Sequence, residues 1–307
     1  MPSAIELEYH IVDVFTTAAL AGNPLAVVFN TCGLTTERMQ AIAREFNLSE
    51  TTFIERGDPA AELSEGVRVR IFTTQEELNF AGHPTLGTAS VLMRTAPDCS
   101  ENQTVKLKLN VGTVPVRFSA AGSNSNGLHG EMTQRDPVFG AELDRDHVAQ
   151  LCGLSPSDLE PALTPQVVST GTAFAIVVLR SMDALGRLKV DHDAATPRLR
   201  ESGARWFYVM APAPDQNQDP TKPHYRARMQ FNGAEDPATG SAAGCAISYL
   251  VEHSAVASDN PIIVTQGVEM GRPSVLHLIA RKLDTGVTDV RVGGSTVPVA
   301  NGRLFLP

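Results

Sequence analysis

The feature that most constrains the fold of this chain occurs once in each half of the sequence. It is an alternating segment that runs through a glycine-rich turn into an apolar segment. In the second half, apolar and polar residues alternate over Tyr225–Phe231, followed by Gly233–Gly244 (GAEDPATGSAAG) and the apolar segment Cys245–Leu250. Alternation with a period of two is typical of a strand with one buried face. The pattern therefore predicts that the glycines lie where a strand turns into a helix.

The first half contains a second copy of this arrangement. Val67–Thr73 alternates in the same way and precedes Phe80–Ala89 (FAGHPTLGTA) and the apolar segment Ser90–Met93. Pro84 fits the first helical turn, where its missing N–H costs nothing. The unpaired N–H groups and the positive dipole end of such helix starts favour a carboxylate or another anion. Two such units predict two related domains whose helix starts face a shared cleft.

Length and charge exclude several classes of protein. A chain of 307 residues, 42% of them hydrophobic, can bury two ordinary cores. Its formal net charge of −9, with no basic cluster, argues against nucleic-acid and anionic-membrane partners. Met1–Glu6 lacks the basic and apolar regions of a secretory signal, and the longest apolar run, near Phe174–Leu179, is too short to span a bilayer. We therefore expect a cytoplasmic protein.

The cysteines and histidines give no sign of a metal or redox site. The four cysteines, Cys32, Cys99, Cys152 and Cys245, are scattered and form no Cys-x-x-Cys pair. Scattered thiols suit a reducing compartment. The eight histidines form no cluster with ligand spacing. We therefore expect no metal site.

Many alternating strands and few longer helices predict an α+β chain built on curved, largely antiparallel sheets. The stretch Ser119–Gly130 is rich in Ser, Gly and Asn, and we interpret it as the domain boundary. We place an N-terminal domain at residues 1–125 and a C-terminal domain at residues 126–286. The end segments near Val290 and Leu304 can complete a sheet in either domain.

Two polar residues of the first half are candidate proton carriers. Glu50 follows a predicted helix end at Asn47 and precedes a strand, a place from which side chains often project into a cleft. A solvated loop glutamate is the commoner explanation of such a position. His83, between Gly82 and Pro84, can exchange a proton near neutral pH, or it can simply hold the loop by a backbone hydrogen bond.

The second half adds a carboxylate and a hydroxyl. Asp236 stands at the rim of the glycine-rich turn, although aspartate before proline is also common turn chemistry. Ser241 leaves room for a ligand at the helix start, or it caps the helix. No Ser-His-Asp arrangement, phosphate-binding loop or dinucleotide fingerprint is present. An imidazole and two carboxylates around two helix starts fit proton transfer on a small anionic substrate.

Six stretches, taken together, carry a family resemblance. They occur in one order across nearly the whole chain: Asp13–Phe15, Gly22–Pro24, Asn47–Phe53, Phe80–Ala89, Glu235–Gly244 and Gln266–Pro273. In this order they resemble the phenazine-biosynthesis isomerase (PhzF-like) family, within the diaminopimelate-epimerase-like fold. The resemblance implies two similar domains, each a curved, mostly antiparallel, β-barrel-like sheet around a central helix. It also implies that the last strand, about residues 287–307, returns to the first domain, that the protein is a homodimer, and that no cofactor or metal is used.

The resemblance also implies roles for individual residues. The glutamate that matches Glu50 is the acid/base that moves a proton between two carbons of a dihydro-hydroxyanthranilate. His83 and Asp236 match residues that assist it. The positions that match substrate-binding residues are Asn23, Ser49, Gly82, Gly240 and Ser241.

One departure from the epimerase branch of the fold is informative. Those epimerases carry one cysteine in each glycine motif, whereas the matching positions here are Ala81 and Thr239. Two-thiol racemisation is therefore disfavoured. The hypothesis is a cofactor-independent isomerase that moves a proton between carbons of a small cyclic or amino-substituted carboxylic acid. A lyase, a one-base epimerase or a non-catalytic binding protein on the same scaffold are the alternatives.

For Glu50 to carry the proton, its pKa should lie closer to neutrality than the usual value of about 4.3. Enclosure in the cleft would raise the pKa, because burial disfavours the carboxylate form.

This hypothesis needs no thiol. Replacing Cys32, Cys99, Cys152 and Cys245 one at a time by Ser or Ala should leave turnover largely intact, unless the change disturbs the helix that carries Cys245. Turnover and circular dichroism of each variant test this expectation. A variant that keeps its fold and loses turnover would point to a thiol mechanism instead.

Overall fold

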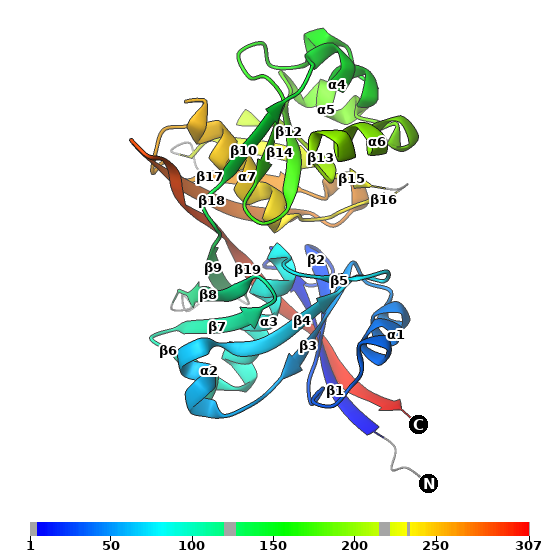
Figure 1. The fold of residues 1–307 in the computed structure, drawn as a ribbon, viewed down its shortest axis with the longest axis vertical. Coiled ribbons are helices and arrows are strands. Elements are labelled where there is room, and N and C mark those ends of the chain that lie inside the picture. Colours follow the sequence, from blue (N-terminus) through cyan, green and yellow to red (C-terminus); the bar gives the residue numbers. More distant parts are fainter. Residues whose placement is uncertain (1–4, 120–126, 215–221, 232–233, 307) are drawn as a thin grey trace. The chain divides into compact units, whose positions relative to one another are not determined.

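The computed structural model describes residues 5–119, 127–214, 222–231 and 234–306. It divides the chain into two compact units (Figure 1). The N-terminal unit contains Met1–Thr133 and Gly293–Pro307, and the C-terminal unit contains Gln134–Val292. The boundary that the sequence predicts, between residues 125 and 126, lies outside the described residues, as does Gly233. The division observed here comes after residue 133.

Eight strands of the N-terminal unit form a closed ring. β1 pairs with β2, and the ladder continues through β3, β4, β7, β8 and β9 to β19, which also pairs with β1. The pairs β2–β3 and β4–β7 are parallel. The strands are β1 (Ile5–Val14), β2 (Asn23–Val28), β3 (Glu50–Glu55), β4 (Val67–Phe72), β7 (Thr104–Leu109), β8 (Gly112–Phe118), β9 (Leu128–Thr133) and β19 (Gly286–Leu306).

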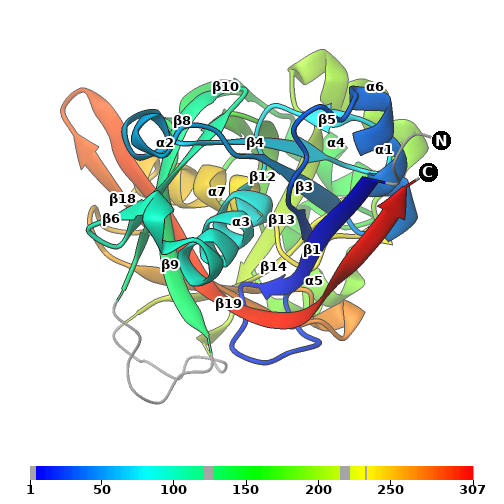
Figure 2. The same cartoon turned by 90° about the horizontal axis from the view of Figure 1, so that it is seen from below.

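Helix α3 (Gly82–Thr95) lies inside this ring, as Figure 2 shows. It packs against β1, β2, β3, β7, β8 and β9, and every residue from Gly82 to Leu92 is buried. A helix buried on all sides needs an apolar or small residue on every face. The sequence Gly-Thr-Ala-Ser at residues 87–90 meets this need in a narrow space.

The C-terminal unit repeats the order of strand pairs. The ladder runs β10–β11–β12–β13–β14–β17–β18 and on to the start of β19, with β12–β13 and β14–β17 parallel. Helix α7 (Gly240–Glu252) follows β14 as α3 follows β4, and its residues Gly240–Val251 are buried. The strands are β10 (Val138–Glu142), β11 (Gln166–Ser169), β12 (Ala173–Val178), β13 (Trp206–Pro212), β14 (His224–Arg228), β17 (Ile262–Gln266) and β18 (Ser274–Leu283).

The remaining helices lie outside the two sheets. In the N-terminal unit they are α1 (Thr36–Phe46) and α2 (Pro59–Glu65), and in the C-terminal unit α4 (Arg145–Leu151), α5 (Met182–Arg187) and α6 (His192–Ser202). The short elements are β5 (Glu77–Leu78), β6 (Ser100–Glu101), β15 (Gln230–Phe231), β16 (Ala234–Glu235), η1 (Pro97–Cys99), η2 (Pro156–Asp158) and η4 (Val268–Met270). No helix in the described ranges is long and apolar enough to cross a membrane.

Helix α1 delivers the chain to the start of β3. Thr35 caps it by accepting a hydrogen bond from the backbone N–H of Arg38, and Asn47 ends it in the left-handed conformation with φ 51°. The helix end at Asn47 agrees with the sequence prediction. The left-handed residue turns the chain so that Glu50 opens β3 beside Leu25 of β2.

The two units share one plan, a curved and mostly antiparallel sheet around a central helix. This confirms the predicted α+β fold class. The long strand β19 belongs to both units, because residues 286–292 lie in the C-terminal unit and residues from 293 onward lie in the N-terminal unit.

A pair of glycine variants tests the packing of α7. A methyl group on Gly244 would collide with the buried carboxamide of Gln134, which donates to Gly240 O (2.9 Å) and accepts from Thr170 Oγ1 (2.6 Å). We expect Gly244→Ala to lower the free energy of unfolding by about 2–4 kcal/mol, since overpacking and lost hydrogen bonds add. Gly186→Ala in α5 is the control, because no atom lies within 4 Å of the added carbon. Urea titration of both variants measures the difference, and equal stability would contradict the packing described.

Candidate active site

Glu50 and His83 lie against one another in the N-terminal unit. Glu50 is the first residue of β3, and His83 is the second residue of α3. Nε2 of His83 is 3.3 Å from Oε2 of Glu50, and the two side chains are 4% and 16% exposed. A carboxylate and an imidazole from separate motifs are thus within reach of proton exchange and poorly accessible to water.

Asn23 holds the other side of the imidazole. It is the first residue of β2, is fully buried, and places Nδ2 3.2 Å from Nδ1 of His83. A carboxamide nitrogen can only donate, so Nδ1 accepts and the imidazole proton resides on Nε2. Nε2 is also the ring nitrogen that lies 3.3 Å from Glu50 Oε2, although these two atoms do not form a hydrogen bond. Sequence reasoning expected Asn23 to line the substrate pocket and did not foresee its contact with His83.

Burial also determines the charge of His83. Its pKa falls to about 3, because the imidazolium would lose its hydration in this position. The ring is therefore neutral near pH 7. It acts as an N–H donor of fixed direction rather than as a cation.

Two further predicted residues adjoin this pair along the chain. Ser49 is half-buried and immediately precedes Glu50, and Gly82 is buried and opens α3. The N-cap residue of α3 is Ala81, which has no side chain that can cap the helix. Other groups must therefore satisfy the N–H donors of the first turn, and a bound anion is one such group.

The C-terminal unit brings together the predicted residues of the second motif. Asp236 is 9% exposed, and its Oδ2 accepts a hydrogen bond of 2.6 Å from Thr239 Oγ1. Thr239 is the N-cap residue of α7 but makes no side-chain cap bond to the helix, since its hydroxyl points back to Asp236. Gly240 and Ser241 form the buried first turn that follows. Ser241 lies within the helix and is not its cap.

The structure adds Gln266 to this group. Its Nε2 is 2.9 Å from Thr239 Oγ1, although the two residues are 27 positions apart. Sequence reasoning included Gln266 only as a member of a matching stretch and mentioned Thr239 only as the replacement of a cysteine. The stretch that begins Gln266–Gly267 indicated that Gln266 matters, but the sequence did not show that its side chain contacts Thr239.

The thiol of α7 is a poor candidate for proton transfer. Cys245 is buried with its Sγ 3.6 Å from Thr170 Oγ1, and burial raises the pKa of this thiol to about 11. A thiol of that pKa stays protonated near neutral pH. Within the described ranges, no group of three or more His, Cys, Asp or Glu side chains could hold a metal ion.

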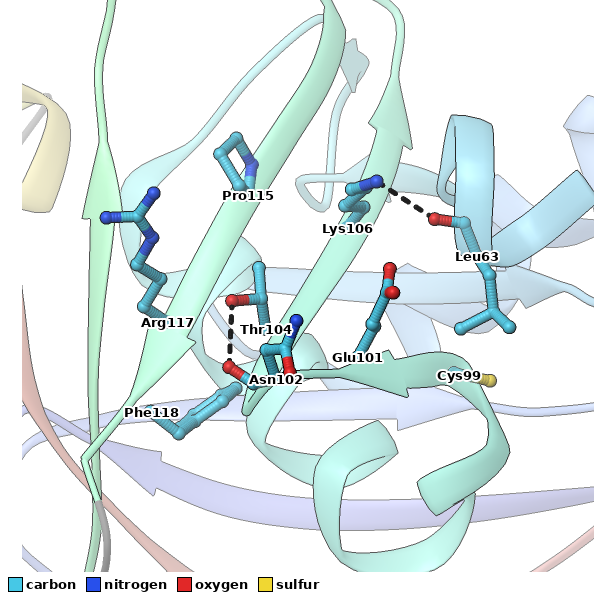
Figure 3. Close-up of a pocket in the computed structure, with 9 residues that line it drawn as sticks. All are labelled: Leu63, Cys99, Glu101, Asn102, Thr104, Lys106, Pro115, Arg117 and Phe118. Atoms are coloured by element: carbon cyan, nitrogen blue, oxygen red, sulfur yellow. Dashed lines mark hydrogen bonds between the residues drawn. The ribbon is translucent and has the colours of Figure 1, made fainter.

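A pocket of about 510 Å³ in the N-terminal unit is lined by other residues (Figure 3). Its one lysine is already held by the chain, because Lys106 Nζ donates to the backbone oxygen of Leu63 at 3.0 Å. The lining residues are Leu63, Cys99, Glu101, Asn102, Thr104, Lys106, Pro115, Arg117 and Phe118. None of the predicted site residues is among them.

The repeated sheet-and-helix plan places the chain in the class of two-domain α+β proteins with one central helix in each domain. A family model described as "Phenazine biosynthesis-like protein" matches residues 12–302. The chain belongs to that family.

Relatives and solved structures agree with this assignment. The chain is 33% identical over 309 residues to a trans-2,3-dihydro-3-hydroxyanthranilate isomerase of Pseudomonas fluorescens, covering 97% of this chain and 99% of the relative. It is 34% identical over 305 residues to the uncharacterized isomerase mll1393 of Mesorhizobium japonicum, with 97% of this chain and 98% of the relative covered. The structure of the predicted epimerase PA4716 of Pseudomonas aeruginosa superposes with a TM-score of 0.80 at 36% identity, with 97% and 98% covered. The chain is thus an enzyme of the isomerase class.

The neutral state of His83 should be visible in the pH dependence of stability. With a pKa of about 3 in the folded protein and about 6.5 in the unfolded chain, the unfolded state binds the extra proton in between. Stability from this group is therefore complete above pH 6.5 and declines as the pH falls toward 3. The slope is up to about 1.4 kcal/mol per pH unit.

His83→Asn should reduce the pH slope of the free energy of unfolding by the contribution of about one proton. Urea unfolding between pH 4 and 7 measures this slope. The matched control is His147→Asn, since His147 is exposed on α4. A slope that His83→Asn leaves unchanged would mean that His83 is charged in the folded protein.

Proposed function

We propose that the protein is a cofactor-independent isomerase that moves a proton between two carbons of a small cyclic or amino-substituted carboxylic acid. The observation that carries this proposal is the shielded Glu50–His83 pair, with 3.3 Å between Oε2 and Nε2. The 33% identity to a trans-2,3-dihydro-3-hydroxyanthranilate isomerase supports this substrate class. As the family resemblance implies, we also propose that the protein is a homodimer.

In this mechanism Glu50 is the proton carrier. Its carboxylate removes a proton from one carbon of the substrate and returns it to another, so the same group serves first as base and then as acid. Limited exposure of Glu50 supports this role, because few water molecules can reach the captured proton and exchange with it.

His83 supplies an N–H donor that reinforces the transfer. In the resting enzyme the donor nitrogen lies 3.3 Å from Oε2 of Glu50 without a hydrogen bond between them. Once Glu50 has taken the proton, its neutral carboxyl attracts the N–H less strongly. The donor can then stabilise negative charge that develops on the substrate. Asn23 keeps the ring in the tautomer that this step requires.

The second group of residues binds the substrate in this proposal. The first turn of α7, at Gly240 and Ser241, has backbone N–H groups and the positive end of the helix dipole for a carboxylate. The Asp236 carboxylate accepts a hydrogen bond from an amino or hydroxyl group of the substrate and so orients it. As the family resemblance implies, Ser49 and Gly82 also bind the substrate in this proposal.

The test is Glu50→Gln, which keeps shape and hydrogen bonding but cannot carry the proton. With trans-2,3-dihydro-3-hydroxyanthranilate in heavy water, the wild type should form an isomer with deuterium incorporated or with the proton transferred directly. Mass spectrometry and NMR distinguish the two results. We expect Glu50→Gln to retain its fold and to lose about 10²–10⁴-fold in turnover.

Glu55→Gln is the matched control, because Glu55 ends the same strand and is half-buried like Glu50. It should keep turnover near that of the wild type. Near-normal turnover in Glu50→Gln would mean that this glutamate does not carry the proton, and the mechanism would be wrong.

The products also separate the alternatives. Deuterium entering one stereocentre with inversion would indicate a one-base epimerase, and departure of a substituent would indicate a lyase. Binding without any exchange would indicate a non-catalytic binding protein.

A further inference from the structure

The carboxamide of Gln266 is fully occupied by one turn of the chain and one tyrosine. Gln266 ends β17 and is fully buried. Its Oε1 accepts from Tyr208 Oη (3.1 Å) and from the backbone N–H of Thr239 (3.2 Å). Its Nε2 donates to the backbone oxygen of Asp236 (2.8 Å) and to Thr239 Oγ1 (2.9 Å). All four hydrogen-bonding positions of the carboxamide are therefore filled.

This arrangement fixes the direction of the Thr239 hydroxyl. The Thr239 N–H needs an acceptor, which places Oε1 of Gln266 beside it and Nε2 beside the hydroxyl. Because Nε2 can only donate, Thr239 Oγ1 accepts from it and directs its own hydrogen to Asp236 Oδ2 at 2.6 Å. A hydroxyl that donates to a carboxylate forms a strong, charge-assisted hydrogen bond.

Gly267 allows the two segments to lie this close. It has φ +78°, and a Cβ at this position would lie 2.5 Å from the backbone oxygens of both Pro237 and Arg272. A side chain here would push β17 away from the turn that carries Asp236. Gln266 and Gly267 thus together hold residues 236–239 against the end of β17.

We propose that Gln266 is a positioning residue that orients the Asp236 carboxylate for the reaction, acting through the hydroxyl of Thr239. Two of the contacts of Gln266, to the N–H of Thr239 and to the backbone oxygen of Asp236, are enough to hold the turn of residues 236–239. The contact to Thr239 Oγ1 has a separate effect, because it determines the direction in which that hydroxyl donates its hydrogen bond. The inference rests on the proposed function, in which Asp236 contacts the substrate.

Crystal structures of two variants without substrate test the relay directly. Thr239→Val keeps the shape of the side chain but cannot donate, and Thr239→Ser keeps the hydroxyl. We expect the Asp236 carboxylate to turn out of its present orientation in the valine variant and to keep it in the serine variant. A carboxylate that keeps its orientation in Thr239→Val would overturn the proposal, whatever the activity.

Gln266→Glu tests whether Gln266 determines the direction of the Thr239 hydroxyl. As an ionised carboxylate, the new side chain cannot donate to Thr239 Oγ1 or to the backbone oxygen of Asp236, so the hydroxyl can turn toward residue 266 and leave the Asp236 carboxylate. With trans-2,3-dihydro-3-hydroxyanthranilate as the probe, we expect turnover to fall about ten- to a hundredfold in Gln266→Glu and in Thr239→Val. Thr239→Ser, which keeps the hydroxyl, should keep turnover near that of the wild type.

Gln166→Glu is the matched control. Gln166 is a half-buried glutamine of the same unit that binds Gly140 O (3.2 Å) and His253 Nε2 (2.9 Å) and contacts neither Thr239 nor Asp236. Turnover of this variant should stay close to that of the wild type. A fall equal to that of Gln266→Glu would mean that any lost glutamine contact slows the enzyme, and the proposal would fail.

A double-mutant cycle separates this inference from the proposed function. If Gln266 and Thr239 act through Asp236, Thr239→Val should cost turnover in the wild type and almost nothing in an Asp236→Asn background. Full additivity would overturn the positioning role while leaving the function standing. Normal turnover in Asp236→Asn would instead remove Asp236 from the mechanism, and the relay with it.

Discussion

The structure depends on one physical constraint, a helix buried on all sides by the strands of its own unit. Such a helix has no solvent face, so its residues must be small or apolar wherever strands pass close to it. Helix α7 meets the constraint with Gly240–Ala246, and α3 meets it with residues 87–90. Neither helix start has a side-chain cap, so both present N–H groups that need a partner. In the proposed function, these N–H groups are where the carboxylate of the substrate binds.

The period-two alternation was sufficient to predict the α+β class, whereas the plan of a sheet around a central helix came from the family resemblance. Alternating residues identified the strands, and the glycine-rich stretches identified the helix starts and therefore His83 and Asp236. The contacts could not be predicted. Asn23 and His83 are 60 positions apart, and Thr239 and Gln266 are 27 apart, so both pairs meet only because the sheet returns the chain to the same place. A spacing along the chain does not specify such a distance.

The position of the domain boundary shows a second limit of prediction from the sequence. The Ser-, Gly- and Asn-rich stretch from residue 119 to 130 marks a break in the sequence pattern, and composition alone places the boundary there. Hydrogen bonding places it later, because β9 (Leu128–Thr133) pairs with β8 and closes the first ring through β19. Turn-forming composition reports where the chain bends. The pairing of the next strand decides to which unit the chain returns.

The two glycine motifs differ in the chemistry that they retain, and this bears on the type of reaction. At the positions where related epimerases carry thiols, this chain has Ala81, which cannot titrate, and Thr239, whose hydroxyl is engaged by Asp236 and Gln266. In the proposed mechanism Glu50 is then the single proton carrier. Racemisation by two carriers needs a second acid on the opposite face of the same carbon. One carrier that keeps its proton returns it on the face from which it came, so a net change requires a different carbon. The loss of both thiols therefore favours isomerisation over racemisation on the same scaffold.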